Sequence, residues 1–216
     1  MDQRSLLEFM TIAEKLKCNL RHSCTSSGRP ESVAEHTFRL IMFAWLVEDA
    51  FPECDSDRVM KMCLLHDMGE AVTGDVPAFE KKEEDRMTEK DAIYQIAEVL
   101  PDKKRKEFLM LLEELEASET MEAKIVHALD KMEAIIQHNE ASIDTWLPLE
   151  YDLQLTYGQE QAKAHPYLER LRELIRQDTL DKIDAAVDEA LDEQMGLQGF
   201  YKMQCENNLA EEKNVT

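Results

Sequence analysis

The sequence predicts a single all-α domain, and three observations support this prediction. The chain has 216 residues, of which 44% are hydrophobic and 33% are charged, which is typical of one foldable domain with a sizeable core. Glycine and proline number only six each, so few tight hairpin turns are available. Apolar residues recur with helical periodicity along most of the chain, whereas no alternation with a period of two persists beyond a few residues.

The first predicted helix lies near the N-terminus. Five apolar residues there share one helical stripe: Leu6, Met10, Ala13, Leu16 and Leu20. Residues 21–31 follow and are rich in Ser, Gly, Pro and other turn-forming residues, so we expect a loop there.

The second predicted helix has a strong start signal. Ser32 and Glu35 have the Ser-x-x-Glu spacing of a capping box, just past Pro30. This helix is expected to extend to about Phe51 and to end at Pro52. Its inward residues are expected to be Val33, Leu40, Ala44 and Val47.

Four further helices are expected before residue 144. One should begin at residues 55–57 and stop before a break at residues 73–77, where glycine and proline gather. The others are predicted at residues 80–100, after Pro101, and from Thr120 to about 143. Their inward residues, in chain order, are expected to be Val59, Met62, Cys63; Ile93, Ile96, Ala97, Leu100; Phe108, Leu111, Leu112, Leu115; Ile125, Leu129, Met132 and Ile136.

The C-terminal part is predicted to hold two more helices and a tail. Pro166 suits the first turn of a helix through Ile175, and an amphipathic stripe over residues 180–191 should stop at Gly196. The predicted division is an HD-type domain over residues 1–177, an amphipathic helix over residues 178–196 and a flexible tail over residues 197–216.

Composition excludes several classes of protein. The chain has 25 Lys and Arg against 46 Asp and Glu, a net charge of −21, and a protein that binds nucleic acid polymers needs a basic surface instead. No apolar run approaches the roughly 20 residues that span a bilayer, and the N-terminus does not resemble a signal peptide. The five cysteines form no Cys-x-x-Cys motif, which favours free thiols in a reducing compartment. We therefore expect a cytoplasmic protein.

A candidate metal ligand pair lies at the end of the third predicted helix. His66 follows Val59 by seven residues and Met62 by four, so it shares their inward stripe, and Asp67 is adjacent. An imidazole beside a carboxylate at a buried helix end needs a partner, and a divalent cation accepts both ligand types. For an isolated His-Asp pair, a core histidine bonded to a carbonyl would be the better interpretation.

Two further residues favour the metal interpretation. His36 is also inward-facing, three residues after Val33, and Asp130 lies on an otherwise apolar helical face, where a charge is costly unless it is paired or bound to a metal. Three separate predicted helices therefore each direct a residue of ligand type inward.

The order His36, His66-Asp67, Asp130 on an all-helical chain resembles the HD-domain metal-dependent phosphohydrolases. The detail resembles one branch, the bacterial 5′-deoxyribonucleotidases and their eukaryotic relatives. The resemblance covers about residues 1–177, and the matching motifs are Arg21, Pro30–His36, His66–Glu70, Thr73–Pro77 and Ala128–Lys131.

The resemblance implies a role for each matching residue. His36, His66, Asp67 and Asp130 would bind one divalent ion, and two nitrogen and two carboxylate ligands without a thiolate suit Mn, Co, Fe or Zn. The remaining implied roles are Glu70 as general acid or base, Asp75 for the sugar hydroxyl or proton transfer, and Arg21 for the phosphate. Taken alone, these three residues would be a solvated carboxylate, a turn former and a surface loop arginine.

Two histidines call for separate interpretations. In the branch, the phosphate arginine is normally followed by a tryptophan that presses on the sugar, but here His22 follows Arg21. The preference for deoxyribose is therefore expected to be weaker in this chain. His127, three residues before Asp130, is interpreted as a core histidine, with support of the metal site as the alternative.

The leading hypothesis is metal-dependent hydrolysis of (deoxy)nucleoside 5′-monophosphates to nucleoside and phosphate. One alternative is another HD phosphohydrolase, acting on cyclic nucleotides or nucleoside triphosphates. Those members commonly carry extra ligand histidines before the final Asp, and this chain has only His127 between Asp67 and Asp130. The other alternative is a non-catalytic nucleotide-sensing module. The family also leads us to expect a homodimer.

Overall fold

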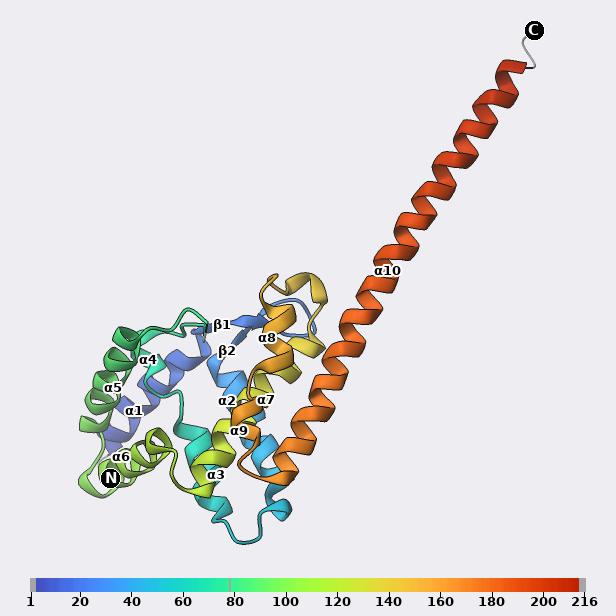
Figure 1. Cartoon of the computed structure of the whole chain (residues 1–216). Coiled ribbons are helices and arrows are strands. Elements are labelled where there is room, and N and C mark those ends of the chain that lie inside the picture. The colour runs from blue at the N-terminus through green and yellow to red at the C-terminus, as the bar shows by residue number, and fades with distance from the viewer. Residues whose placement is uncertain (1–2, 78, 214–216) are drawn as a thin grey trace.

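The computed structural model describes residues 3–77 and 79–213, with residue 190 and residues 192–213 described by their backbone only. It confirms the all-α prediction, apart from one two-stranded sheet. The elements are α1 (Gln3–Glu14), η1 (Lys15–Lys17), β1 (Leu20–Cys24), β2 (Pro30–Ser32), α2 (Val33–Val47), η2 (Glu48–Ala50), α3 (Ser56–Leu65), α4 (Glu70–Thr73), α5 (Glu83–Glu98), α6 (Asp102–Ala117), α7 (Met121–Glu140), η3 (Ile143–Thr145), α8 (Glu150–Thr156), α9 (Gln159–Ala162) and α10 (Pro166–Lys213). Figure 1 shows the helices gathered into one body, from which α10 projects.

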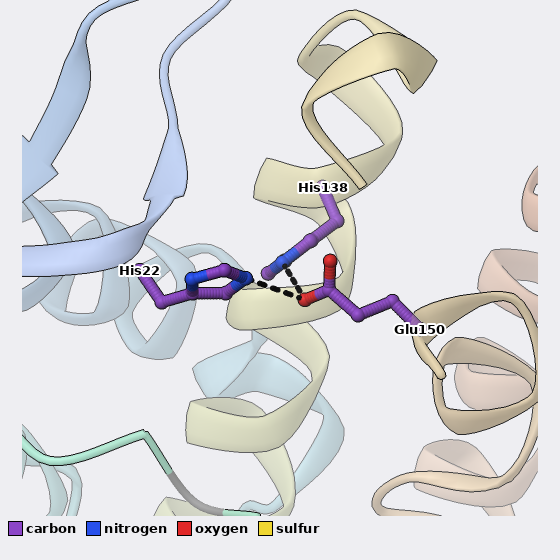
Figure 2. A group of neighbouring side chains, drawn as sticks. All are labelled: His22, His138 and Glu150. Atoms are coloured by element: carbon purple, nitrogen blue, oxygen red, sulfur yellow. Dashed lines mark hydrogen bonds and ion pairs between the residues drawn. The ribbon is translucent and has the colours of Figure 1, made fainter. Parts of the chain in front are cut away.

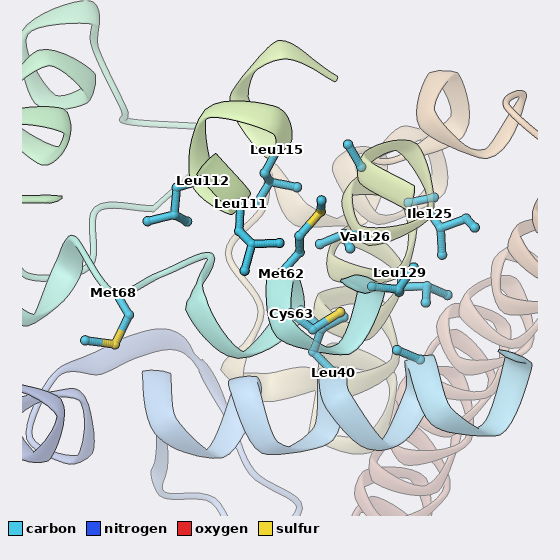
Figure 3. Close-up of a cluster of buried hydrophobic side chains, with 14 of the residues drawn as sticks. Leu40, Met62, Cys63, Met68, Leu111, Leu112, Leu115, Ile125, Val126 and Leu129 are labelled. Atoms are coloured by element: carbon cyan, nitrogen blue, oxygen red, sulfur yellow. The ribbon is translucent and has the colours of Figure 1, made fainter. Parts of the chain in front are cut away.

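The core is built around α7. Helices α2, α3, α6, α9 and α10 all contact α7, and Leu129 and Met132 of α7 are fully buried. Figure 3 shows the buried side chains that meet between α2, α3, α6 and α7. Because α2 and α7 carry two of the predicted metal ligands and the other two directly follow α3, the packing that stabilises the fold also fixes the site.

Three helix starts are fixed by side-chain caps, and the first of these is the predicted capping box. The hydroxyl of Ser32 accepts a hydrogen bond from the backbone N–H of Glu35 at 3.3 Å, and the Glu35 carboxylate accepts one from the Ser32 N–H at 2.9 Å. Asp55 caps α3, and Thr120 caps α7. Such caps each contribute about 0.5–2 kcal/mol.

The predicted loop at residues 21–31 is wrong, because most of it is an antiparallel hairpin. Strands β1 and β2 pair with Leu20 opposite Ser32 and Cys24 opposite Pro30, and Gly28 takes φ +82° in the turn. The strands are too short to show an alternating pattern, which explains why the sequence did not reveal them. The pairing of Leu20 with Ser32 places the beginning of β1 beside the start of α2.

The predicted burial of the first helical stripe is confirmed in part. Leu16 is buried and Ala13 packs against the core, but Leu6, Met10 and Leu20 are exposed. Phe9 and Ile12 of α1, which the predicted stripe left out, also pack against the core. Phe9 meets Phe108 of α6 edge-on, with ring centroids 6.3 Å apart. The second helix is shorter than expected, because α2 ends at Val47 and η2 follows.

The C-terminal elements differ most from expectation. The two predicted helices are one continuous helix, α10, which begins at Pro166 as expected but passes through Gly196 to Lys213. Leu168, Ile175 and Thr179 are buried, whereas Val187 and Leu191 of the predicted amphipathic stripe are exposed. The last three residues of the predicted tail, 214–216, lie outside the described residues.

Two exclusions drawn from the sequence can be compared with the structure. None of the described helices combines the length and the apolar character needed to cross a membrane. Four cysteines, Cys18, Cys24, Cys54 and Cys63, are free thiols, and the side chain of Cys205 lies outside the described residues.

Candidate metal centre

His36 presents its Nε2 atom to the predicted metal site because its other nitrogen is already bound. The capping box fixes the first turn of α2, and the His36 side chain in that turn is fully buried. Its Nδ1–H donates a hydrogen bond to the Glu133 carboxylate of α7. The lone pair on Nε2 is therefore free to bind a cation, which is the usual arrangement of a metal-bound histidine.

His66 presents the same atom for a different reason. It caps the C-terminus of α3, and its Nδ1 lies 2.8 Å from the carbonyl oxygen of Cys63. Because a carbonyl can only accept, the proton must be on Nδ1 and the lone pair on Nε2.

The four predicted ligands converge from three elements. The His36 Nε2 atom lies 3.3 Å from His66 Nε2 and 3.1 Å from Asp130 Oδ1, and His66 Nε2 lies 2.9 Å from Asp67 Oδ2. The two longer separations are 3.9 Å from His36 to Asp67 and 3.8 Å from His66 to Asp130. Ligand atoms about 2.0–2.2 Å from one ion lie roughly 2.8–3.6 Å from one another, so the cluster fits one ion with small adjustments.

The charge of the cluster also fits a cation. Burial raises the pKa values of Asp67 and Asp130, but the neighbouring histidines outweigh it and lower both pKa values, so both residues are anionic. Burial and Arg21 lower the pKa of His36, but hydrogen bonds to Asp130 and Glu133 raise it overall, to about 10. In the absence of a metal, a proton therefore holds the carboxylates and imidazoles together, and a divalent cation can replace it.

A second buried group of possible metal ligands also includes His36, but arginine side chains already pair with its carboxylates. Glu31 and Glu133 form this group with His36, and the Nδ1 atom of His36 bonds to Glu133. Arg21 Nε is 3.3 Å from Glu31, and Arg39 Nε is 3.3 Å from Glu133. Each carboxylate already has an arginine, so the Nε2 side is the better metal site.

The cluster of predicted ligands borders a cavity of about 420 Å³, and the other predicted site residues line the same cavity. Arg21, His22, Asp67, Glu70, Asp75 and Asp130 all line this cavity. Arg21 Nη1 lies 3.9 Å from Asp67 Oδ2, beside the metal ligands and not on an open surface. The guanidinium is therefore positioned to hold an anion next to the metal.

Glu70 lies on the wall of this cavity with one carboxylate oxygen, Oε2, buried and without a hydrogen-bond partner. Burial, together with the charges of Asp67 and Asp75, raises its pKa to about 10, so Glu70 is protonated near neutral pH. The residue before Glu70 must be small. A Cβ atom at Gly69 would lie 2.6 Å from Glu89 Cγ and 3.1 Å from the Glu89 carbonyl oxygen, so a larger residue there would clash with Glu89. Burial also raises the pKa of Asp75.

His22 and His127, the two other histidines discussed from the sequence, have different surroundings in the structure. His22 lines the cavity, and its ring meets Phe79 edge-on with centroids 5.6 Å apart. His127 Nε2 lies 2.8 Å from the Leu115 carbonyl oxygen, as expected of a core histidine bonded to its neighbours.

Sequence reasoning missed several residues that support the site. Glu133 follows Asp130 by three residues, so helical spacing could have identified it as the partner of a ligand. Glu31 is inside a recognised motif, but its burial was not foreseen. Lys81 and Glu150 also line the cavity, and no local signal in the sequence marks either one.

The comparisons agree with this geometry. A family model described as HD domain matches residues 13–172, which is more than half of the chain. The chain belongs to the HD domain family. A relative named 5′-deoxynucleotidase HDDC2 from Homo sapiens is 37% identical over 141 residues, covering 63% of this chain and 68% of the relative.

A relative of lower sequence identity and a solved structure are also similar to this chain. A protein from Erwinia tasmaniensis named 5′-deoxynucleotidase is 27% identical over 173 residues, covering 74% of this chain and 87% of the relative. The crystal structure of a predicted metal-dependent phosphohydrolase from Magnetospirillum magnetotacticum superposes with a TM-score of 0.71 at 24% identity, covering 83% of this chain and 95% of that chain. At this level of identity, the superposition establishes the shared fold.

Proposed function

We propose that this chain hydrolyses (deoxy)nucleoside 5′-monophosphates to nucleoside and phosphate, with a divalent metal bound by His36, His66, Asp67 and Asp130. The observation that carries the proposal is the convergence of these four ligands beside Arg21 and the protonated Glu70 in one cavity. Relatives named 5′-deoxynucleotidase support the choice of substrate.

Each residue of the cavity has a separate role in the proposed reaction. His36, His66, Asp67 and Asp130 would hold a divalent cation, which would supply Lewis acidity and lower the pKa of a bound water. Arg21 holds the phosphate through a charged donor fork, which offsets the negative charge of the substrate. Glu70 donates a proton to the departing 5′-oxygen, which its raised pKa suits. Asp75 binds a sugar hydroxyl at the wall of the cavity.

The ligand set also restricts the metal. Two imidazole nitrogens and two carboxylates suit Mn, Co, Fe or Zn, and none of the four ligands is a thiolate, which softer ions prefer. Both His36 and His66 use Nδ1 within the protein, so each contributes Nε2 alone.

The proposal extends to the assembly and location of the protein. Phe38, Met42, Trp45 and Leu46 are exposed and share one face of α2, with helical spacing. An exposed apolar stripe of this kind favours association, so we assign α2 as the contact of a homodimer. The free thiols are consistent with a cytoplasmic location.

Phosphate release from a panel of mono-, di-, tri- and cyclic nucleotides tests the proposed activity. The metal-loaded protein should release phosphate from 5′-monophosphates, and Asp130→Asn should abolish release. Asp178→Asn, an exposed carboxylate on α10, is the matched control and should retain it. Faster turnover of triphosphates or cyclic nucleotides would indicate the other phosphohydrolases, and metal-dependent nucleotide binding without turnover would indicate a sensing module.

A further inference from the structure

A second group of ligand-type side chains lines the same cavity. His22 of β1, His138 of α7 and Glu150 of α8 point toward one another (Figure 2). Glu150 Oε1 lies 3.2 Å from His22 Nε2 and 2.9 Å from His138 Nε2. One ligand atom from each residue lies within 4.8 Å of the others.

The hydrogen bonds of His138 leave a lone pair facing the carboxylate. Its Nδ1 lies 2.8 Å from the carbonyl oxygen of Ala134, so the proton is on Nδ1. In the neutral ring, Nε2 then directs its lone pair at Glu150 Oε1. Two electron-rich atoms 2.9 Å apart need a positive charge between them, either a proton or a metal ion.

Glu150 is held in the orientation that a metal ligand requires. Its side chain is 1% exposed, and its Oε2 accepts a hydrogen bond from the Leu147 N–H at 2.7 Å. This bond turns Oε1 toward the two histidines. A fully buried carboxylate bonded in this way keeps its position whether or not a cation is present.

The separations match those around a metal ion. Ligands of one ion are expected roughly 2.8–3.6 Å apart, and the two measured separations lie within this range. His22 and His138 are 29% and 13% exposed, so a cation can reach the cluster from the cavity. Two histidines and one glutamate, with a fourth position open, form a ligand set of the kind found in zinc enzymes.

We propose that His22, His138 and Glu150 bind a second divalent transition-metal ion, of the zinc class, in addition to the ion at His36, His66, Asp67 and Asp130. The open position of this second ion faces the cavity and is available to water or to a donor atom of a bound molecule. The proposal concerns metal binding, and it stands whether or not the chain hydrolyses nucleotides.

Zinc stoichiometry of the full-length, tag-free protein tests this inference. Metal-free protein is equilibrated with Zn²⁺, and bound zinc per chain is measured by elemental analysis and calorimetry. Wild type should bind two ions, His22→Gln and Glu150→Gln should each bind one, and His66→Gln should retain the ion at the second cluster. The affinity of the second site should fall by at least tenfold in either variant.

The controls separate a lost site from a lost fold. His127→Gln changes another α7 histidine that lines the cavity but bonds to Leu115, so it should still bind two ions. Circular dichroism verifies folding, and His22 is partly exposed, so its variant serves if Glu150→Gln misfolds. One zinc ion in the wild type, or two in His22→Gln, would overturn the proposal and leave a proton shared among the three side chains.

Discussion

At the scale of single residues, the centre depends on which nitrogen each histidine offers. Glu133 takes the Nδ1–H of His36, and the Cys63 carbonyl takes that of His66, so both Nε2 atoms face Asp67 and Asp130. Spacing and polarity in the sequence predicted the four ligands, because a charged or imidazole side chain on an apolar face stands out. Helical spacing from Asp130 could have marked Glu133 as a supporting residue, but its pairing with His36 could not be predicted, because that contact joins residues 97 positions apart.

Replacement of Glu70 by glutamine should retain the metal but reduce turnover. Glutamine keeps the size of the side chain but cannot donate a proton to the leaving group. General acid–base groups typically contribute roughly 10²–10⁴-fold, so kcat should fall by about that factor. Phosphate release, with metal content measured in parallel, checks this result. A kcat within a few-fold of wild type would remove Glu70 from the reaction.

The same substitution should stabilise the metal-free protein in a pH-dependent way. The pKa of Glu70 is raised from 4.5 to about 10, so between these values the unfolded chain loses a proton that the folded chain keeps. Wild-type stability therefore falls as pH rises through this window, and glutamine removes the loss. The Tm of the variant should match that of wild type near pH 4.5 and exceed it increasingly toward pH 8, by roughly 2–4 °C for each kcal/mol. A Tm difference independent of pH would contradict this assignment.

His22 should determine how strongly the cavity discriminates between sugars. The Nε2 atom of His22 faces Glu150, and the ring is smaller than a tryptophan wall that would exclude a 2′-hydroxyl. The chain should therefore accept ribonucleoside as well as deoxyribonucleoside monophosphates. His22→Trp should raise the dAMP-to-AMP ratio of kcat/KM. His138→Gln is the control, because it changes the same cluster without adding a wall, and it should leave the ratio unchanged. Strong deoxy selectivity in the wild type would refute the idea.

At the scale of elements, the sequence predicted helix starts better than helix ends. Ser32, Asp55 and Thr120 each cap a helix, because a cap is a local arrangement of side chain and backbone. The expected stop at Gly196 is wrong, because an isolated glycine weakens a helix by only about 1 kcal/mol and does not end it. The hairpin of β1 and β2 depends on pairing between separate segments, which periodicity cannot reveal.

The far end of α10 should be dispensable for folding and hydrolysis. Among the α10 side chains that the structure describes, burial ends at Thr179. Truncation after Gly196 should therefore leave the Tm and the phosphate release nearly unchanged. Truncation after Arg172 is the contrast, because it removes the buried Ile175 and Thr179 and should lower the Tm sharply. Loss of soluble protein in the first truncation would show that this end packs on the core or bridges subunits.

At the scale of the whole molecule, the acidic chain places cationic side chains among the carboxylates of its cavity. The net charge is −21, yet Arg21, Lys81, Arg86 and Lys131 line the cavity together with the predicted metal ligands Asp67 and Asp130. Under the proposed function, a phosphate monoester would therefore meet cationic groups inside the cavity of a chain that is anionic as a whole.

The proposed dimer should depend on the apolar face of α2. Light scattering should give twice the chain mass of 25.0 kDa for the wild type. A Trp45→Lys, Leu46→Lys variant should give the mass of one chain, because both side chains are more than half exposed in the single chain and their charges would oppose association. Val187→Lys on the exposed part of α10 is the control and should remain dimeric. A monomeric wild type would contradict the assignment of α2.

The position of bound metal in a crystal of the metal-loaded protein tests the central claim most directly. Anomalous scattering at the metal edge should place one ion about 2.0–2.2 Å from His36 Nε2 and His66 Nε2, with Asp67 and Asp130 completing the set. No ion at these four ligands, or an ion on the Nδ1 side of His36 between Glu31 and Glu133, would contradict the account.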